Sequence, residues 1–233
     1  MIAIEPYRGR FRIVQDGAVL REVMTAQAAL EFLHLQLFTS SIADFPNASI
    51  LHAACLRREQ KRFLLVGSKG TGKSTLTLRL VHAGYEIEGD EHVFLEGAQV
   101  VARPRGCRVR ESALQYLPEM AGVITSSPRY QESWSGLFFN VDPRDFSIDW
   151  RIERGKVDCI FVLRPNHGGY SSIRPMPPSA LIQSLMTETG WREAHRNTSI
   201  AHMVAVSNSA RAFDLSLGDH TTALRCIECA LKA

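Results

Sequence analysis

The chain has 233 residues, of which 45% are hydrophobic and 22% are charged, and its formal net charge is +3. This composition is ordinary for a globular protein, and the length suffices for one domain with a full core or two small ones. No run of 18 apolar residues occurs, so no membrane-spanning helix is expected, and the small net charge does not indicate nucleic-acid binding.

The sequence shows neither a secretory signal nor a pattern of paired cysteines. The N-terminal residues lack the basic and apolar blocks of a secretory signal. The five cysteines are odd in number and scattered, which does not suggest a disulfide framework. We therefore expect a cytoplasmic protein.

The first 48 residues predict short strands followed by a helix. Residues 7–14 alternate in polarity, Asp16-Gly17 is a hairpin turn signal, and residues 18–20 return as a second strand. Thr25 is placed to cap a helix that continues to about Ser40. We expect residues 1–48 to pack on an α/β core formed by residues 49–233.

That core is predicted to begin with two strands joined by a charged turn. Residues 49–56 form an apolar run that contains His52, and residues 62–66 form a second one. Apolar runs of this length, bounded by charged residues, are typical of buried strands.

Directly after the second strand, the sequence fits the phosphate-loop pattern without a mismatch. Its glycines let the backbone aim successive N–H groups into one concavity, and the following helix, expected over residues 75–83, adds its positive dipole end. Lys73 can reach the terminal phosphates and the Ser74 hydroxyl can hold Mg²⁺. The alternative is a glycine-rich turn with a chance lysine, which the agreement of strand, loop and helix disfavours. The predicted ATP-binding residues are Gly67, Ser68, Lys69, Gly70, Thr71, Gly72, Lys73, Ser74 and Thr75.

A second acid that holds the metal is expected at the end of a buried strand. Asp158 precedes the apolar run of residues 159–163, which is the wrong end of that strand. The pair Asp90-Glu91 instead lies on the strand that comes directly after the phosphate-loop helix. Neighbouring strand residues point to opposite faces, so one acid would face the phosphates and the other would support or bind the metal. A solvated acidic turn is the alternative.

A basic segment follows, with Arg103, Arg105, Arg108 and Arg110 on an extended stretch. Alternating arginines suit phosphate or an acidic peptide, and they equally suit a solvated basic strand edge. Among them Arg103 and Arg105 are the favoured substrate or phosphate contacts. The sequence of residues 111–150 predicts no clear order of elements.

The remaining chain predicts a strand at residues 159–163, a strand at 212–217 and three helices. These helices are expected from Ser179 to Met186, from about residue 195 to 206, and over residues 221–231. Cys226 and Cys229 fall within the last helix, where packing explains them better than metal binding.

Three motifs together resemble the catalytic domain of HPr kinase/phosphorylase. They are the histidine strand Leu51-His52-Ala53-Ala54, the phosphate loop, and residues 84–91 with their acidic pair. The shorter HPr-kinase-related proteins, often found among genes for modified peptides, look similar along nearly the whole chain. The resemblance implies a phosphoenolpyruvate-carboxykinase-like fold and Mg²⁺-dependent phosphoryl transfer from ATP to a hydroxyl. It also implies a peptide or small-protein acceptor and a possible homo-oligomer.

Carried over by position, the resemblance makes Lys73 the phosphate contact and places Mg²⁺ between Ser74 and Asp90. Asp90 would be the base, and Glu91 a metal ligand or its support. His52 would lie near that acid in the catalytic site, although a lone histidine in an apolar strand can equally be a hydrogen-bonded core residue.

The chain departs from that family in three respects. Only about 50 residues precede His52, Glu91 replaces an aspartate, and a later glycine-rich segment has no clear match. HPr itself and the reverse reaction are therefore not expected. The rival hypothesis is a nucleotide-binding accessory protein of a peptide-modification system that transfers nothing. A phosphate-loop ATPase is a third, which the missing downstream acid disfavours.

Overall fold

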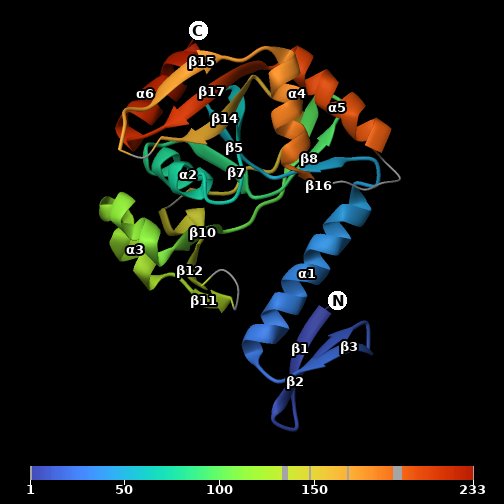
Figure 1. Cartoon of the computed structure of the whole chain (residues 1–233). Helices are drawn as coiled ribbons and strands as arrows, with labels where there is room; N and C mark the ends of the chain where they lie inside the picture. The colour runs from blue at the N-terminus through green and yellow to red at the C-terminus, as the bar shows by residue number, and fades with distance from the viewer. Residues whose placement is uncertain (1, 133–135, 147, 167, 191–195, 233) are drawn as a thin grey trace. The chain divides into compact units, whose positions relative to one another are not determined.

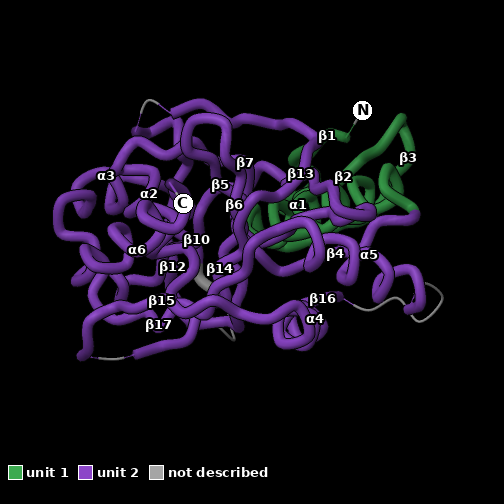
Figure 2. Tube along the Cα trace, turned by 90° about the horizontal axis from the view of Figure 1, so that it is seen from above, with its two compact units in different colours: residues 1–46 green, residues 47–233 purple. Residues whose placement is uncertain are grey.

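The computed structural model describes residues 2–132, 136–146, 148–166, 168–190 and 196–232. These residues form a mixed α/β structure that divides into two compact units, residues 1–46 and residues 47–233 (Figure 2). Among the described residues, no helix combines the length and the apolar character needed to cross a membrane.

The first unit is an antiparallel meander followed by one long helix (Figure 1). Its elements are β1 (Ile2–Tyr7), β2 (Arg10–Gln15), β3 (Ala18–Val23) and α1 (Ala26–Asp44). Asp16 and Gly17 both have positive φ, as the predicted hairpin turn requires. The Thr25 hydroxyl accepts a hydrogen bond from Ala28 N at 3.1 Å, which confirms the predicted cap, and the helix then continues to Asp44.

The second unit is built around a six-stranded sheet with the order β15-β17-β14-β6-β5-β7. Its strands are β5 (Ala53–Arg58), β6 (Lys61–Val66), β7 (Glu86–Asp90), β14 (Cys159–Pro165), β15 (Ser172–Pro175) and β17 (Arg211–Leu217). Strands β6, β14 and β17 are parallel, and β7 runs in the same direction because β5 is antiparallel to both β6 and β7. The carboxyl ends of these four strands therefore meet at one edge, which is where open α/β sheets bind ligands.

Four helices cover the two faces of this sheet (Figure 1). They are α2 (Lys73–His82), α4 (Pro178–Thr187), α5 (Arg196–Ser209) and α6 (His220–Lys232). Alternate residues of β6 point to opposite faces: Phe63 packs with the buried leucines of α2 and with α6, whereas Leu64 packs with α4 and α5. The predicted helices that begin near 179, 195 and 221 correspond to α4, α5 and α6, although residue 195 itself lies outside the described residues.

Two smaller sheets complete the second unit. One has the order β13-β9-β8-β4-β16, with β4 (Ser49–Leu51), β8 (Val93–Glu96), β9 (Gln99–Ala102), β13 (Gly155–Lys156) and β16 (Thr189–Gly190). The other has the order β10-β12-β11, with β10 (Cys107–Arg110), β11 (Arg129–Glu132) and β12 (Gly136–Val141). The segment for which the sequence predicted no order also holds α3 (Ala121–Ser126) and three short 3₁₀ helices. These are η1 (Glu111–Tyr116), η2 (Pro118–Met120) and η3 (Pro143–Phe146).

The prediction of one continuous strand over residues 49–56 is wrong. Ser49–Leu51 pairs with β8 and β16, whereas Ala53–Arg58 pairs with β6 and β7 in a different sheet. His52 lies at the crossing, and its backbone N–H donates to Glu188 O at 2.8 Å. An apolar run records burial but not a change of partner strand, so the sequence alone could not show the break.

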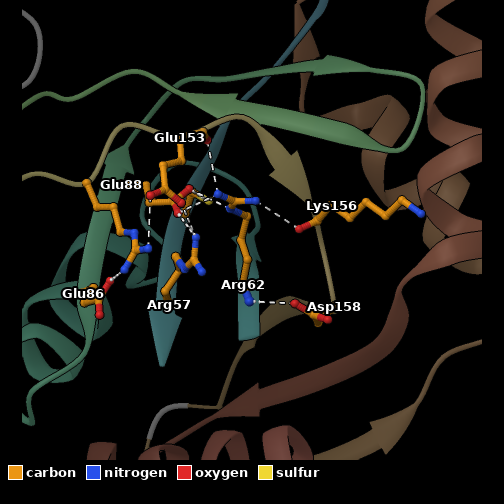
Figure 3. Close-up of polar contacts among 9 residues, drawn as sticks. Arg57, Arg62, Glu86, Glu88, Glu153, Lys156 and Asp158 are labelled. Atoms are coloured by element: carbon orange, nitrogen blue, oxygen red, sulfur yellow. Dashed lines mark hydrogen bonds and ion pairs between the residues drawn. The ribbon is translucent and has the colours of Figure 1, made fainter. Parts of the chain in front are cut away.

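A buried cluster of ion pairs ties β5, β6 and β7 together (Figure 3). The Glu88 side chain is fully buried and accepts from Arg62 Nε at 2.8 Å and Arg62 Nη2 at 2.9 Å. Arg57 Nη1 lies 3.7 Å from Glu88 and donates to Glu153 at 2.7 Å. The exposed Asp158 carboxylate accepts from the backbone N–H of Arg62 at 2.8 Å and so holds the start of β6 next to this cluster.

Candidate functional site

The phosphate loop connects the end of β6 at Val66 to the start of α2 at Lys73. Gly70 and Gly72 have φ of 90° and 95°, a conformation that residues with a Cβ rarely adopt. Gly72 occupies the N-cap position of α2 and has no side chain to satisfy the first-turn N–H groups. Those donors and the positive end of the helix dipole therefore suit an anion.

The conformation of Gly72 leads to a first prediction. A Cβ at this position would be strained at φ +95° and would lie 3.0 Å from Leu217 Cδ2. We expect Gly72→Ala to destabilise the protein by about 1–2 kcal/mol and to weaken nucleotide binding, measured by thermal unfolding and by titration with a fluorescent ATP analogue. Gly122→Ala is the matched control, because its Cβ would meet no atom within 4 Å. Equal behaviour of the two variants would contradict the loop geometry.

Lys73 is directed at the loop itself. Its ammonium donates to the carbonyl of Gly67 and to that of Ser68 at 3.2 Å. Burial lowers its pKa, while the nearby charges of Glu188 and Asp90 oppose that shift. The cation is thus held within the concavity that the loop N–H groups would offer to phosphate.

Asp90 lies at the end of β7 and is only 4% exposed. Burial raises its pKa, while Ser74, Lys73, Arg105 and Cys107 oppose that shift. The Ser74 hydroxyl and the Asp90 carboxylate line the same cavity and offer it two hard oxygen donors. Mg²⁺ is commonly bound by one or two carboxylates together with substrate phosphates, so this donor set fits it. The described residues hold no cluster of three or more His, Cys, Asp or Glu side chains arranged for a metal.

Glu91 adopts a strained backbone conformation with φ of 107°. Its N–H donates to Ala53 O at 3.1 Å, and its carboxylate pairs with Arg105. Arg105 is thus engaged by the second acid of the pair. The two adjacent acids differ in environment, since Asp90 is buried and Glu91 is half-buried beside an arginine, and both line the same cavity.

His52 and the phosphate loop both contact Glu188, which follows α4. His52 Nδ1 lies 3.4 Å from Glu188 Oε2, and Ser68 Oγ donates to Glu188 Oε1 at 2.7 Å. The Glu188 side chain is 8% exposed. Burial lowers the pKa of His52, the charge of Lys73 lowers it further, and Glu188 opposes both. Sequence reasoning missed Glu188, because an isolated glutamate at the end of a predicted helix carries no signal.

These groups surround one cavity of about 470 Å³, a size typical of small-ligand sites. Its polar lining from the predicted site includes His52, Lys69, Gly70, Thr71, Gly72, Lys73, Ser74, Thr75, Asp90 and Glu91. Residues that follow β14 and β17 complete one wall, namely Asn166, Gly168, Gly218 and His220. The cavity therefore lies at the carboxyl edge of the six-stranded sheet.

Comparisons with known proteins do not identify the function of this cavity. No family model matches the chain, and no curated protein matches it in sequence. A solved structure, the HPr(Ser) kinase/phosphatase from Coxiella burnetii, is similar at 13% identity and a TM-score of 0.37, over 79% of this chain and 99% of that chain. A likeness of this strength carries no inference about activity. Function is therefore inferred from the cavity.

The basic segment divides between the cavity and its surroundings. Among the described residues, the lining includes Arg108 and Arg110 but not Arg103 or Arg105. Arg103 N donates to His92 O at 3.0 Å, and Arg105 pairs with Glu91. The Arg108 guanidinium lies 4.0 Å from the centre of the Phe138 ring. Alternation indicated a shared face for these arginines, but only the sheet partners of β10 show which pair lines the cavity.

Proposed function

We propose that the protein is a Mg²⁺- and ATP-dependent kinase that transfers a phosphoryl group to the hydroxyl of a serine or a similar residue. The observation that carries this proposal is that Ser74 of the phosphate loop and the buried Asp90 at the end of β7 line one cavity together with Lys73. It brings a metal-binding acid to the loop without the downstream acid of ordinary phosphate-loop ATPases. A phosphoenolpyruvate-carboxykinase-like arrangement of the core, and cytoplasmic residence, belong to the same proposal.

The lining residues suit phosphoryl transfer by positioning and charge. The loop N–H groups and Lys73 would bind the phosphates, and Ser74 with Asp90 would hold Mg²⁺. Bound Mg²⁺ would neutralise charge on the transferring group. Enclosure of both substrates in one cavity fixes the hydroxyl against the phosphorus, which supplies much of the rate in this reaction class.

The charge of the cavity favours an acidic acceptor. Lys69, Lys73, Arg108 and Arg110 line it against Asp90 and Glu91, so cations exceed anions among the described lining residues. Arg108 and Arg110 lie two residues apart on β10 and so share one face of that strand. We propose that the acceptor is a peptide or small protein with acid groups near its hydroxyl, and that the enzyme acts as a homo-oligomer.

The test is mass spectrometry after incubation with ATP, Mg²⁺ and serine-containing peptides, including those encoded beside the gene. A gain of about 80 Da on a serine marks phosphoryl transfer, and Lys73→Ala is expected to abolish it. Matched peptides with Glu or Gln flanking the serine report the preference for acid. Tight nucleotide binding without transfer to any peptide would overturn the kinase and favour the accessory protein.

A further inference from the structure

Glu188 makes three contacts, two with His52 and one with Ser68 of the phosphate loop. Its carboxylate reaches His52 and Ser68 through different oxygens, and its backbone carbonyl accepts from His52 N. Next to it, β16 pairs with β4, in the register Thr189↔Leu51 and Gly190↔Ile50. Both the backbone and the side chain of His52 are therefore positioned by one residue that is distant in sequence.

This arrangement determines which ring nitrogen of His52 is available. A neutral imidazole has one N–H and one lone pair, and a carboxylate beside Nδ1 accepts the N–H there. Nε2 then carries the lone pair, and His52 lines the same cavity as Lys73 and Asp90. A histidine held in this way accepts a proton on Nε2 while the carboxylate stabilises the resulting cation.

We propose that Glu188 is a positioning residue that holds His52 as the proton acceptor for the reacting hydroxyl, and that Asp90 serves Mg²⁺ with Ser74. This inference rests on the proposed kinase function and changes the sequence-based assignment of Asp90 as the base. The cavity supports the division of roles, because Asp90 lines it together with Ser74 and Lys73, whereas Glu188 contacts His52.

The step balances as follows. The hydroxyl proton moves to Nε2 of His52, and the acceptor oxygen forms a bond to the terminal phosphorus of ATP. The bond from that phosphorus to the bridging oxygen breaks, and its electron pair leaves on ADP. The imidazolium of His52 then releases its proton to water, which restores the neutral base.

The charges that face His52 set the direction of its pH dependence. Glu188 at the end of α4 is the anion, Lys73 of α2 and Lys69 of the loop are the cations, and His92 after β7 is a further titratable neighbour. Burial lowers the pKa of His52, so its imidazole is neutral at pH 7 and competent to accept a proton. Removing the charge of Glu188 takes away an attraction for the cation and lowers the pKa of His52 further.

The first experiment needs no acceptor. The imidazole nitrogens are titrated by NMR in the wild type, in Glu188→Gln and in His52→Asn, which identifies the His52 signal among the eight histidines. We expect a protonated Nδ1 in neutral wild-type His52 and a lower pKa in Glu188→Gln. An unchanged pKa, or a proton on Nε2, would overturn the pairing even if the kinase function stands.

The second experiment follows kcat against pH with the peptide that gains phosphate. Glu188→Gln is expected to lower kcat by about 10- to 100-fold and to move the acidic limb to lower pH, and Glu188→Asp to restore part of kcat. Ser68→Ala should raise the KM for ATP without moving the limb, and exposed Glu228→Gln should match the wild type. If Glu188→Gln lowers the pKa of His52 measured by NMR but leaves the acidic limb of the kcat profile unmoved, His52 is not the base. Failure of the wild type to phosphorylate any peptide would overturn the kinase function alone, because the titration decides the pairing.

Discussion

Asp90→Asn is expected to lower phosphoryl transfer by about 10²- to 10³-fold, the scale seen when one group that stabilises the transition state is removed. The variant keeps the shape of the side chain and removes its charge next to Ser74. Nucleotide affinity without Mg²⁺ should stay near that of the wild type, because the loop and Lys73 are untouched. The gain in affinity on adding Mg²⁺ should disappear, as measured by calorimetry with and without the metal.

The fold should survive this change. Burial raises the pKa of Asp90 above its usual value, so folding favours its protonated form. The stability linked to that proton is present at low pH and is lost as the pH rises through the folded pKa, so at pH 7 the charge is a cost. Asparagine removes that cost, and we expect a melting temperature equal to or above that of the wild type.

Asp149→Asn is the matched control, because Asp149 is exposed. It should leave transfer, Mg²⁺ dependence and melting temperature unchanged. If Asp90→Asn instead lowered the melting temperature by several degrees together with activity, Asp90 would be a structural residue. If it abolished transfer while the Mg²⁺-dependent gain in affinity persisted, Asp90 would not hold the metal.

The parts of the site that follow from sequence are those whose contacts are local. The phosphate loop is a contiguous motif between a strand and a helix, and Asp90 ends the next strand. These residues are close in sequence, so the sequence alone predicts that Lys73, Ser74 and Asp90 lie together. Glu188 is different, because its contacts depend on the pairing of β16 with β4. The same pairing ends β4 at Leu51 and leaves His52 between two sheets, which the apolar pattern could not indicate.

The sequence also could not predict that the charged side chains of Arg62 and Glu88 are buried. Arg57, Arg62 and Glu88 look like charged residues flanking apolar runs, and such residues are usually solvated. In the structure β5, β6 and β7 bring them together, and the exposed fractions of Arg62 and Glu88 fall to 4% and 0%. That burial depends on the strand order, in which β5 lies between β6 and β7, and the backbone carbonyls of Glu153 and Lys156 accept further hydrogen bonds from Arg62.

Arg62→Met is therefore expected to destabilise the protein by about 3–5 kcal/mol, the usual cost of leaving one member of a buried ion pair without its partner. Glu88 would lose both hydrogen bonds from the Arg62 guanidinium, and Arg57 at 3.7 Å is already engaged with Glu153. Urea unfolding followed by circular dichroism measures the change. Lys232→Met, which breaks an exposed pair with Glu228, is the control and should shift the midpoint little.

The double variant Arg62→Met/Glu88→Leu distinguishes the cost of an unpaired buried carboxylate from the cost of lost side-chain packing. Replacing both partners by apolar residues of similar size removes the uncompensated carboxylate, so most of the stability lost in Arg62→Met should return. Because Glu88 and Asp90 lie on the same strand, we expect Arg62→Met also to weaken Mg²⁺-dependent nucleotide binding and the double variant to restore it. A single variant no weaker than Lys232→Met would contradict a role for the cluster in stability. Recovery of stability without recovery of Mg²⁺ dependence would show that the ion pair itself, and not merely the packing of β5, β6 and β7, sets the position of Asp90.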